Sequence, residues 1–322
     1  MQPKISVVIP YYQREPGILR KAIVSAIRQT GVGPMEIIVV DDSSPVPARD
    51  ELRELITTNS SQIRIVEQAN AGPAAARNTG LENVSDDTEY VAFLDSDDEW
   101  VDEHLHNALL ALGQGYDFYF ADHFQLNQSV SAFKRAGRIQ VEEHQRLNDA
   151  IHLYRYIGDM FDQILRGNVI GTSTVVYRYH KLPTVRFREE FVYAGEDYLF
   201  WLELSRLTEL VVFSDQCECT YGPGVNVFAG SGWDTEKSLI RTHHEIKYRK
   251  AVAKLFPLNA EQARHNRTTL RGLRTLFIAD VLHRLMHRKP VDRAVLAKQL
   301  RIDPATYWMF VPTALSILLR RT

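Results

Sequence analysis

Four short apolar runs in the first hundred residues constrain the fold more than any other feature of the chain. They cover residues 5–10, 35–40, 62–67 and 90–94, and they are rich in Val and Ile without strict alternation. This pattern is typical of strands buried on both faces, as in a parallel sheet. Helix-like segments separate them, at about 16–29, 47–57 and from Pro73 onward. The alternation predicts a doubly wound α/β domain with a mostly parallel sheet flanked by helices.

After the fourth run the alternation of strands and helices becomes irregular. We expect the elements to be an aromatic strand at 116–126, a polar loop at 127–148, a helix near 149–166, a strand at 172–178 and a helix within 193–207. The stretch 220–234 is rich in glycine and lacks periodicity, so it predicts a mobile loop, with residues 222–232 as a lid over a bound ligand.

The distribution of charge divides the chain. Its 322 residues, 45% of them hydrophobic and 24% charged, suit one large domain with an extension. The net charge is only −2, but residues 237–322 hold 18 basic against 5 acidic side chains. We therefore predict a body at 1–235 and a basic helical extension at 236–322. Such a tail indicates an anionic partner: a membrane, a nucleic acid or the body itself. No nucleic-acid-binding motif accompanies it, so we expect no nucleic acid.

Cysteine usage and the absence of export signals indicate the compartment. Cys217 and Cys219 are expected to be reduced thiols, because nothing in the sequence indicates secretion. The first ten residues lack the basic and long apolar regions of a signal peptide. No apolar run reaches the roughly 18–20 residues that would span a bilayer. We expect a cytoplasmic protein.

Polar and acidic side chains follow the predicted strands at their carboxyl ends, where doubly wound sheets bind ligands. We expect one crevice to be lined by Tyr11, Tyr12, Asp41, Asp42, Asp95 and Asp97. The stretch FLDSDDEW crowds four acidic side chains into five residues, and such a cluster repels itself unless a cation sits among them. Mg²⁺ and Mn²⁺ prefer oxygen ligands and often bridge to phosphates. Taken alone, the cluster equally suits an acidic turn that caps a helix beginning near Val101.

Three further motifs are informative but weak when taken singly. A carboxylate of VVDDSS, Asp41 or Asp42, could bind a ribose hydroxyl or a base N–H, or cap a helix before Pro45. Arg77 follows a glycine-proline turn and could be directed at an anion, or be solvated on an ordinary helix. Glu196 and Asp197 open an apolar helix, where a carboxylate could act as a general base or only as a cap.

Together and in this order, the motifs resemble the family 2 glycosyltransferases of GT-A fold. The resemblance covers about residues 4–210 and rests on SVVIPYYQR, EIIVVDDSS, NAGPAAARNTGL, YVAFLDSDDEW and GEDYLFWLEL. It implies a nucleotide-sugar part at about 1–115 and an acceptor part at about 116–235. The basic tail is not part of the shared pattern.

The resemblance also implies roles for individual residues. The nucleotide-sugar site would comprise Pro10, Tyr12, Asp41, Asp42, Arg77, Asp95 and Ser96. Within it, Asp42 would contact the uracil and Asp95 the ribose. Asp97, with Asp95, would bind a divalent cation, Mn²⁺ or Mg²⁺. His243 or His244 could complete the metal shell, or be a solvated helix residue. Asp197 would be the catalytic base, supported by Glu196.

The implied reaction is an inverting transfer. The base would take a proton from an acceptor hydroxyl on the face of the sugar opposite the leaving UDP, by the same logic as inverting hydrolysis. We expect a hexose, glucose in the first place, to move from a UDP-sugar to a saccharide on a polyprenyl diphosphate. Among bacterial enzymes the chain looks most like the β-glucosyltransferases of succinoglycan-type exopolysaccharide synthesis. The alternatives are a non-catalytic nucleotide-sugar binder or scaffold, and a nucleotidyltransferase, which would need a glycine- and lysine-rich loop in place of PYYQREPG.

The apolar run Tyr307–Leu319 is too short to span a bilayer and ends beside two arginines. It predicts an interfacial anchor on the inner face of the bacterial plasma membrane. The basic side chains expected to face the same surface are Arg264, Arg267, Arg271 and Arg274. The alternative is a helix packed against a neighbour or in a homodimer.

Overall fold

The computed structural model describes residues 4–59, 62–192, 195–224 and 232–319. The chain forms two compact units. The first comprises Met1–Val192 and Asp197–Val225, and the second comprises Tyr193–Glu196 and Asn226–Thr322. The first unit contains the sheet and the second contains the C-terminal helices.

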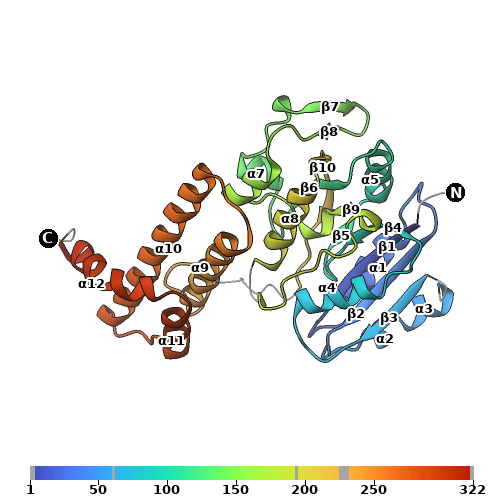
Figure 1. The fold of residues 1–322 in the computed structure, drawn as a ribbon. Coiled ribbons are helices and arrows are strands. Elements are labelled where there is room, and N and C mark those ends of the chain that lie inside the picture. Colours follow the sequence, from blue (N-terminus) through green and yellow to red (C-terminus); the bar gives the residue numbers. More distant parts are fainter. Residues whose placement is uncertain (1–3, 60–61, 193–194, 225–231, 320–322) are drawn as a thin grey trace. The chain divides into compact units, whose positions relative to one another are not determined.

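The four apolar runs form four parallel strands, as predicted. They are β1 (Lys4–Tyr11), β2 (Met35–Asp41), β3 (Ile63–Glu67) and β4 (Thr88–Phe93), and they lie in the order β3-β2-β1-β4 (Figure 1). Strands β1, β2 and β4 are buried on both faces, which explains their apolar runs, whereas the edge strand β3 leaves Arg64 and Glu67 exposed.

The second half of the sheet is mixed. Beyond β4 it continues through β9 (Val176–Arg178), β6 (Phe118–Phe124), β10 (Val211–Thr220), β8 (Leu153–Arg155) and β7 (Gln145–Asn148). Strand β9 is antiparallel to both β4 and β6, and β6 is parallel to β10. Strands β1, β2, β4, β6 and β10 therefore share one direction, so their carboxyl ends meet at one edge of the sheet.

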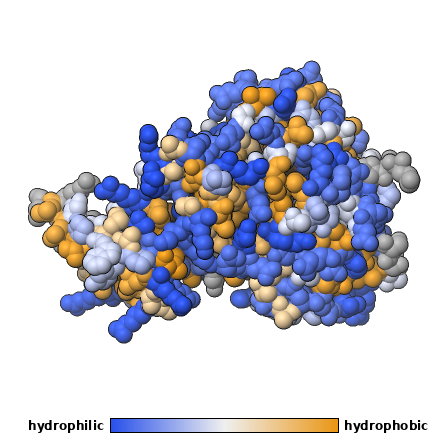
Figure 2. All heavy atoms as spheres, viewed as in Figure 1, coloured by the Kyte–Doolittle hydropathy of each residue, from blue (hydrophilic) through white to orange (hydrophobic). Residues whose placement is uncertain are grey.

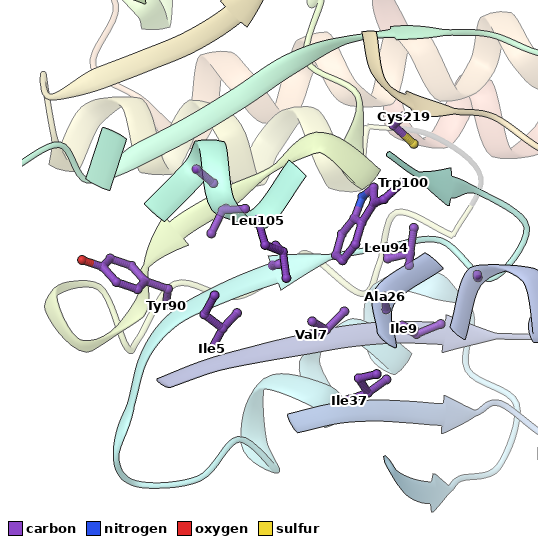
Figure 3. Close-up of a cluster of buried hydrophobic side chains, with 14 of the residues drawn as sticks. Ile5, Val7, Ile9, Ala26, Ile37, Tyr90, Leu94, Trp100, Leu105 and Cys219 are labelled. Carbon is purple, nitrogen blue, oxygen red and sulfur yellow. The ribbon is translucent and has the colours of Figure 1, made fainter. Parts of the chain in front are cut away.

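Helices cover both faces of the sheet. One face packs Ile5, Val7 and Ile9 against α1 (Leu19–Ile27) and α5 (His104–Leu112), as Figure 3 shows in part. The opposite face carries α4 (Pro73–Glu82), where a Cβ on Gly80 would lie 2.3 Å from Val8 Cγ1. Helix α4 can approach β1 closely because Gly80 has no side chain. On this face Phe93 also contacts Phe200 and Trp201 of α8 (Glu196–Leu207).

Some of the expected elements are wrong in detail. The helix expected at 47–57 divides at Leu52 into α2 (Ala48–Glu51) and α3 (Arg53–Thr58). The expected loop at 127–148 contains α6 (Ala132–Ala136) and strand β7. The expected helix at 149–166 begins instead with strand β8, and only its end forms α7 (Met160–Arg166). Pairing of β8 with β10 buries Leu153 and Tyr154, so tertiary contacts override the local helical pattern.

The second unit consists of basic helices, as predicted. They are α9 (Ser238–Leu255), α10 (Ala260–Met286), α11 (Arg293–Ile302) and α12 (Pro304–Leu319). Their small core is formed by Leu239, Ile246, Phe277, Val281 and Val295. Within the ranges that the structure describes, no helix combines the length and the apolar character needed to cross a membrane.

Buried Asp303 ties three of these helices together. Its carboxylate accepts hydrogen bonds from Lys250 of α9 at 3.1 Å and from Arg274 of α10 at 2.7 Å, and Thr306 adds a third bond. Burial alone would raise the pKa of Asp303, but these donors hold it at about 2. The expectation that Arg274 faces a membrane is therefore wrong, because its guanidinium is engaged inside the unit.

Candidate functional site

The acidic turn after β4 is anchored by Asp98, the member to which sequence reasoning gave no role. Its carboxylate is buried and accepts hydrogen bonds from Ser173 Oγ at 2.5 Å and from the Gly222 amide at 3.0 Å. Burial, followed by the charges of Asp95 and Asp97, raises the pKa of Asp98 well above its ordinary value. Asp98 thus connects the acidic turn to the segment that follows β10.

Asp97 is half-buried beside Asp95. Its Oδ2 accepts a hydrogen bond of 2.8 Å from the Gly224 amide. Burial and the neighbouring charge of Asp95 raise its pKa to about 6, so the carboxylates repel one another as the sequence suggested. Oxygen donors crowded in this way fit a hard divalent cation. Among the residues described, no group of three or more His, Cys, Asp or Glu side chains is arranged to hold a metal ion.

Two glycines let the segment after β10 lie directly on Asp97. A Cβ on Gly222 would lie 1.6 Å from the backbone oxygen of Asp97, and one on Gly224 would lie 2.4 Å from its Oδ2. Close backbone approach therefore explains these two glycines of the glycine-rich stretch. The proposed lid mostly falls on residues 225–231, which lie outside the described part of the chain.

Arg77 and Asp95 join the third motif to the fourth. The buried Arg77 Nη2 donates a hydrogen bond of 2.7 Å to Asp95 Oδ1. The guanidinium also lies 5.2 Å from the centre of the Phe187 ring. Arg77 reaches this position because the buried small residues of α4, its alanines and Gly80, let the helix pack closely against β1. The basic group expected at the site is therefore beside the acidic turn.

Ser96 belongs to a polar connection between three strand ends. The side chain of Gln13 donates a hydrogen bond of 3.1 Å through Nε2 to Ser96 Oγ, and the backbone N–H of Gln13 donates one of 2.9 Å to Ser44 Oγ. The residues that follow β1, β2 and β4 are thereby held together. Sequence reasoning missed Gln13, because its partner Ser96 lies far along the chain and its place after Tyr11 and Tyr12 does not reveal that contact.

The two aspartates after β2 differ in what they bind. Asp41 accepts hydrogen bonds from the amides of Ser44 and Ala48 at 2.7 and 2.8 Å, so its carboxylate organises the loop into α2. Asp42 accepts from the amides of Ala71 and Gly72, each at 2.8 Å, and thereby shapes the turn before α4. The helix-capping alternative therefore describes Asp41 well. A contact of either residue with a nucleotide stays a prediction.

The site residues predicted at the end of β1 differ in how deeply they are buried. Pro10 is buried in β1 opposite Val40, and Tyr12 is half-buried just beyond the strand. Tyr11 is only 1% exposed and belongs to the hydrophobic core, so the expectation that it lines the ligand site is wrong. Its ring points into the sheet–helix interior because successive side chains of a strand alternate between faces.

Asp197 lies in the first turn of α8, in the electrostatic field of the other site residues. Its Oδ1 accepts a hydrogen bond of 2.8 Å from the Tyr198 amide. Burial raises the pKa of Asp197, the charge of Arg77 opposes this, and the charge of Asp95 adds to it. A half-buried carboxylate with a raised pKa is suited to proton transfer. Glu196 precedes it and is likewise half-buried.

His243 lies in the helical unit. Its ring is buried in α9, and its Nδ1 shares a hydrogen bond of 2.9 Å with Gln299 Oε1. Burial lowers the pKa of His243 and lowers that of His244 to about 4. The expectation that these are solvated helix residues is therefore wrong, and metal ligation by His243 stays a prediction.

His123 and Tyr221 form an aromatic pair that sequence reasoning did not identify. Their rings stack with centres 4.6 Å apart and planes inclined by 21°. His123 is in β6, which was predicted as an aromatic strand, and Tyr221 directly follows β10. Burial raises the pKa of Tyr221, and the neighbouring negative charges, Asp98 foremost and then including Asp95 and Asp197, raise it further. A signal was present, since both residues lie at or next to the carboxyl ends of strands that form the site edge.

Comparisons of sequence support the same family. A profile described as "Glycosyl transferase family 2" matches residues 6–180. The succinoglycan biosynthesis protein ExoW of Rhizobium meliloti is 36% identical over 232 residues, which are 70% of each chain. The minor teichoic acid biosynthesis protein GgaA of Bacillus subtilis is 30% identical over 62% of this chain, and the match spans only 42% of GgaA.

Solved structures share the fold. S. aureus TarS 1-349, in complex with UDP-GlcNAc, aligns with a TM-score of 0.54 and 18% identity over 92% of this chain and 88% of that one. The mannosyltransferase PcManGT of Pyrobaculum calidifontis, with GDP-Man and Mn²⁺, aligns with a TM-score of 0.59 and 14% identity over 100% and 89%. These likenesses show the GT-A fold. The family profile matches more than half of this chain, and ExoW is 36% identical to it over 70% of both chains. This chain therefore belongs to glycosyl transferase family 2.

Proposed function

We propose that the chain is a metal-dependent inverting glycosyltransferase that moves a hexose from a UDP-sugar to a saccharide hydroxyl. The observation that carries this proposal is the grouping of Arg77, Asp95, Asp97 and Asp197 at the carboxyl edge of the sheet. This edge is where ligands of doubly wound sheets bind. The placement of Asp197 near both Arg77 and Asp95 favours an enzyme over a scaffold protein, which would not need these groups together.

The donor nucleotide is assigned to the loops after β1, β2 and β4. Asp42 retains acceptor capacity for a uracil N–H, because a carboxylate offers about four lone-pair sites and, within the described ranges, Gln68 and Ala71 donate to its Oδ1 and only Gly72 to its Oδ2. Pro10 and Tyr12 flank this position, and Gln13 and Ser96 hold the neighbouring loops in register. Asp95 would bind the ribose, and Arg77, which it orients, would face the phosphates.

A divalent cation fits between the loops because Asp95 and Asp97 present oxygen donors that repel one another without it. The residues that would hold it are Asp97 and Asp95, with His243 as a further candidate. When bound, Mn²⁺ or Mg²⁺ supplies Lewis-acid stabilisation of the diphosphate leaving group. The chain itself supplies the Gly224 amide, which fixes the orientation of Asp97.

Asp197 is proposed as the general base. It would accept the proton of the acceptor hydroxyl while that oxygen attacks the anomeric carbon from the face opposite the nucleotide. A single displacement of this kind inverts the anomeric centre and gives a β-linkage from an α-linked donor. The Tyr198 amide holds Oδ1, so Oδ2 is the oxygen left to take the proton.

The likeness to ExoW supports a place in bacterial polysaccharide synthesis, with glucose as the first candidate sugar. Other relatives and neighbours act in teichoic acid synthesis or bind UDP-GlcNAc and GDP-Man, so the donor panel for assays should include these nucleotide sugars. A lipid-linked saccharide, carried on a polyprenyl diphosphate, is the acceptor we propose.

Helix α12 supports a peripheral position on the inner face of the bacterial plasma membrane. It packs against α10 and α11, and the face that it leaves uncovered exposes Tyr307, Trp308, Val311, Leu315 and Leu319, each by more than half. Figure 2 shows hydrophobic residues gathered over this helix. Arg264, Arg267 and Arg271 are exposed on α10 and would attract anionic lipids. A second copy of the chain could also cover this face.

The proposal is tested by measuring UDP or GDP release with Mn²⁺ and a panel of nucleotide sugars, with and without saccharide acceptors. The Asp197→Asn variant is nearly isosteric, so it should keep donor affinity and lose about 10²–10⁴ in transfer rate. Glu203→Gln, an exchange on the same helix, is the matched control, because Glu203 pairs with Arg188 instead. Near wild-type transfer by Asp197→Asn would remove the base from the mechanism.

A further inference from the structure

The acidic turn after β4 is closed by Ser173, a residue that the mechanism proposed above does not use. The turn covers residues 95–98, and a backbone hydrogen bond of 3.0 Å from the Asp98 N–H to the Asp95 carbonyl joins its ends. Ser173 lies beside it in the 3₁₀ turn Thr172–Thr174, which leads into β9, and is 0% exposed. The contact between the two turns therefore joins segments that are 75 residues apart in the sequence.

The Ser173 hydroxyl bonds to both ends of the acidic turn. Its Oγ accepts a hydrogen bond of 2.9 Å from the Asp95 N–H and donates one of 2.5 Å to Asp98 Oδ2. A hydroxyl has one proton to donate and lone pairs that can accept, so a single serine side chain can make both bonds at once. The hydroxyl thus bridges the first and the last residue of the turn.

Ser173 is itself held by the core of the first unit. Its carbonyl accepts a hydrogen bond from Trp100 Nε1, and the Trp100 ring lies with its centre 4.8 Å from that of the buried His104 ring. Just beyond the 3₁₀ turn, the Val175 carbonyl accepts a hydrogen bond of 3.2 Å from the Phe93 N–H of β4. The hydroxyl is therefore presented by a rigid part of the structure and can resist displacement of the acidic turn.

The acidic turn needs such support because its carboxylates repel one another. The charge of Asp95 acts on both Asp97 and Asp98. Without a cation, this repulsion favours an opened turn, in which the oxygen ligands are separated. A site that is competent for only part of the time binds its ligand more weakly, in proportion to that fraction. A neutral hydroxyl that joins the two ends counteracts the opening without adding charge to the site.

We propose that Ser173 is a positioning residue that holds Asp95 and Asp97 ready for the divalent cation. Arg77 fixes the Asp95 carboxylate and the Gly224 N–H fixes that of Asp97, whereas Ser173 fixes the backbone that carries both. Ser173 acts through the acidic turn and needs no contact with the cation or the substrate. The inference rests on the proposed function, because it takes Asp95 and Asp97 as the metal ligands.

Ser173→Ala tests the proposal because it removes both bonds of the hydroxyl. Thr174→Val is the matched control: Thr174 is equally buried in the same 3₁₀ turn, and its hydroxyl donates a hydrogen bond of 2.8 Å to the Gly171 carbonyl and not to the acidic turn. Mn²⁺ binding in the presence of UDP is measured by electron paramagnetic resonance, which detects free Mn²⁺ and requires no turnover. Initial rates with the best nucleotide sugar of the panel are measured over a range of Mn²⁺ concentrations.

Ser173→Ala should weaken Mn²⁺ binding roughly tenfold, the worth of one hydrogen bond. Its kcat at saturating Mn²⁺ should stay within about threefold of the wild type, because the bound cation then holds the carboxylates together. Thr174→Val should change neither quantity. If Ser173→Ala bound Mn²⁺ as tightly as Thr174→Val does, or lost kcat at saturating Mn²⁺ with its affinity intact, Ser173 would not position the metal ligands.

Hydrogen exchange of the metal-free protein tests the same contact without a cation. The N–H groups of Asp95 and Asp98 should exchange slowly in the wild type and in Thr174→Val, and faster in Ser173→Ala. Rapid exchange of both groups in the metal-free wild type would overturn the proposal even if Ser173→Ala did not fold. Equal loss of protection throughout the sheet of Ser173→Ala would mark a general structural role and overturn it as well.

Failure of this inference can be distinguished from failure of the proposed function. A wild type that binds no Mn²⁺ in the presence of UDP would overturn the proposed metal dependence and, with it, the role of Ser173. Tight Mn²⁺ binding by both the wild type and Ser173→Ala would overturn the role of Ser173 alone and leave the metal dependence standing.

Discussion

Replacing Gly222 by alanine would place a methyl group 1.6 Å from the backbone oxygen of Asp97. Since real Cβ atoms do not approach other atoms closer than 3.0 Å, the two segments must separate by at least about 1.4 Å. Such a movement is large enough to break two hydrogen bonds. One joins the Gly222 backbone N–H to Asp98 at 3.0 Å, and the other joins the Gly224 backbone N–H to Asp97 at 2.8 Å.

The expected loss follows from these contacts. Overpacking costs about 1–3 kcal/mol, and a hydrogen bond to a charged group contributes about 1.5–3 kcal/mol. The segment after β10 can move away without unfolding the sheet, so we expect a decrease of about 2–3 kcal/mol in the free energy of unfolding. The larger effect should be on Asp97, whose freed carboxylate would lose orientation and weaken the binding of UDP with Mn²⁺ by at least about tenfold.

Urea unfolding and calorimetric titration with UDP and Mn²⁺ measure the two effects separately. Gly232→Ala is the matched control in the same glycine-rich stretch, because a Cβ there would meet nothing within 4 Å. If Gly222→Ala bound UDP with Mn²⁺ as tightly as Gly232→Ala, the close contact with Asp97 would have no bearing on the metal site.

The remaining predictions concern the metal, the core, the helical unit and the membrane. Asp97→Ala should abolish transfer and make UDP affinity insensitive to Mn²⁺; full wild-type activity in excess EDTA would contradict this. Glu218→Ala should lower the free energy of unfolding, measured by urea titration, by about 3 kcal/mol, because it leaves the buried donors His104, Asn107 and Tyr119 unpaired. Its control is Glu54→Ala at an exposed ion pair, which should change the free energy of unfolding by less than about 1 kcal/mol. Asp303 has a pKa of about 2, below its ordinary value of 3.8, so its ionised form stabilises the fold above about pH 4. This shift contributes roughly 2 kcal/mol to the free energy of unfolding, and that contribution should fade from pH 5 to 2. The difference in stability between the wild type and Asp303→Asn should narrow over the same range. The double variant Trp308→Ala/Leu315→Ala should float less with anionic liposomes than the wild type does, whereas Trp233→Ala, at an exposed tryptophan outside α12, should float as the wild type does. Equal flotation of the double variant and Trp233→Ala would point to a second copy as the partner of α12.

The first half of the fold follows from the sequence because each of its strands is defined locally. A strand buried on both faces needs only a short apolar run, and β1, β2 and β4 each have one; the edge strand β3 keeps Ile63, Ile65 and Val66 between its exposed polar residues. The second half does not follow in the same way. Strand β8 is three residues long and has two partners: β7, a short and mostly polar strand just before it, and β10, which lies about sixty residues further along the chain. The first partner has no apolar strand pattern and the second lies outside any local window around Leu153, so local helical periodicity misled the prediction.

The same distinction explains which site residues the sequence could reveal. Strand ends are recognisable in the sequence, so Asp95 and Asp97 could be assigned to the site from their positions, and Arg77 from its glycine-proline turn. Asp98 and Gln13 could not, because their roles depend on partners that are distant in sequence, Gly222 for one and Ser96 for the other. The carboxylates of the acidic turn are held by backbone amides of a segment that is distant in sequence and by Arg77. This division predicts how variants should separate: changes at Asp97 should affect metal binding at once, whereas Gln13→Ala should loosen three strand ends and weaken UDP binding without changing its dependence on Mn²⁺. A calorimetric Mn²⁺ titration of Gln13→Ala that shifted with the metal as much as with the nucleotide would contradict that separation.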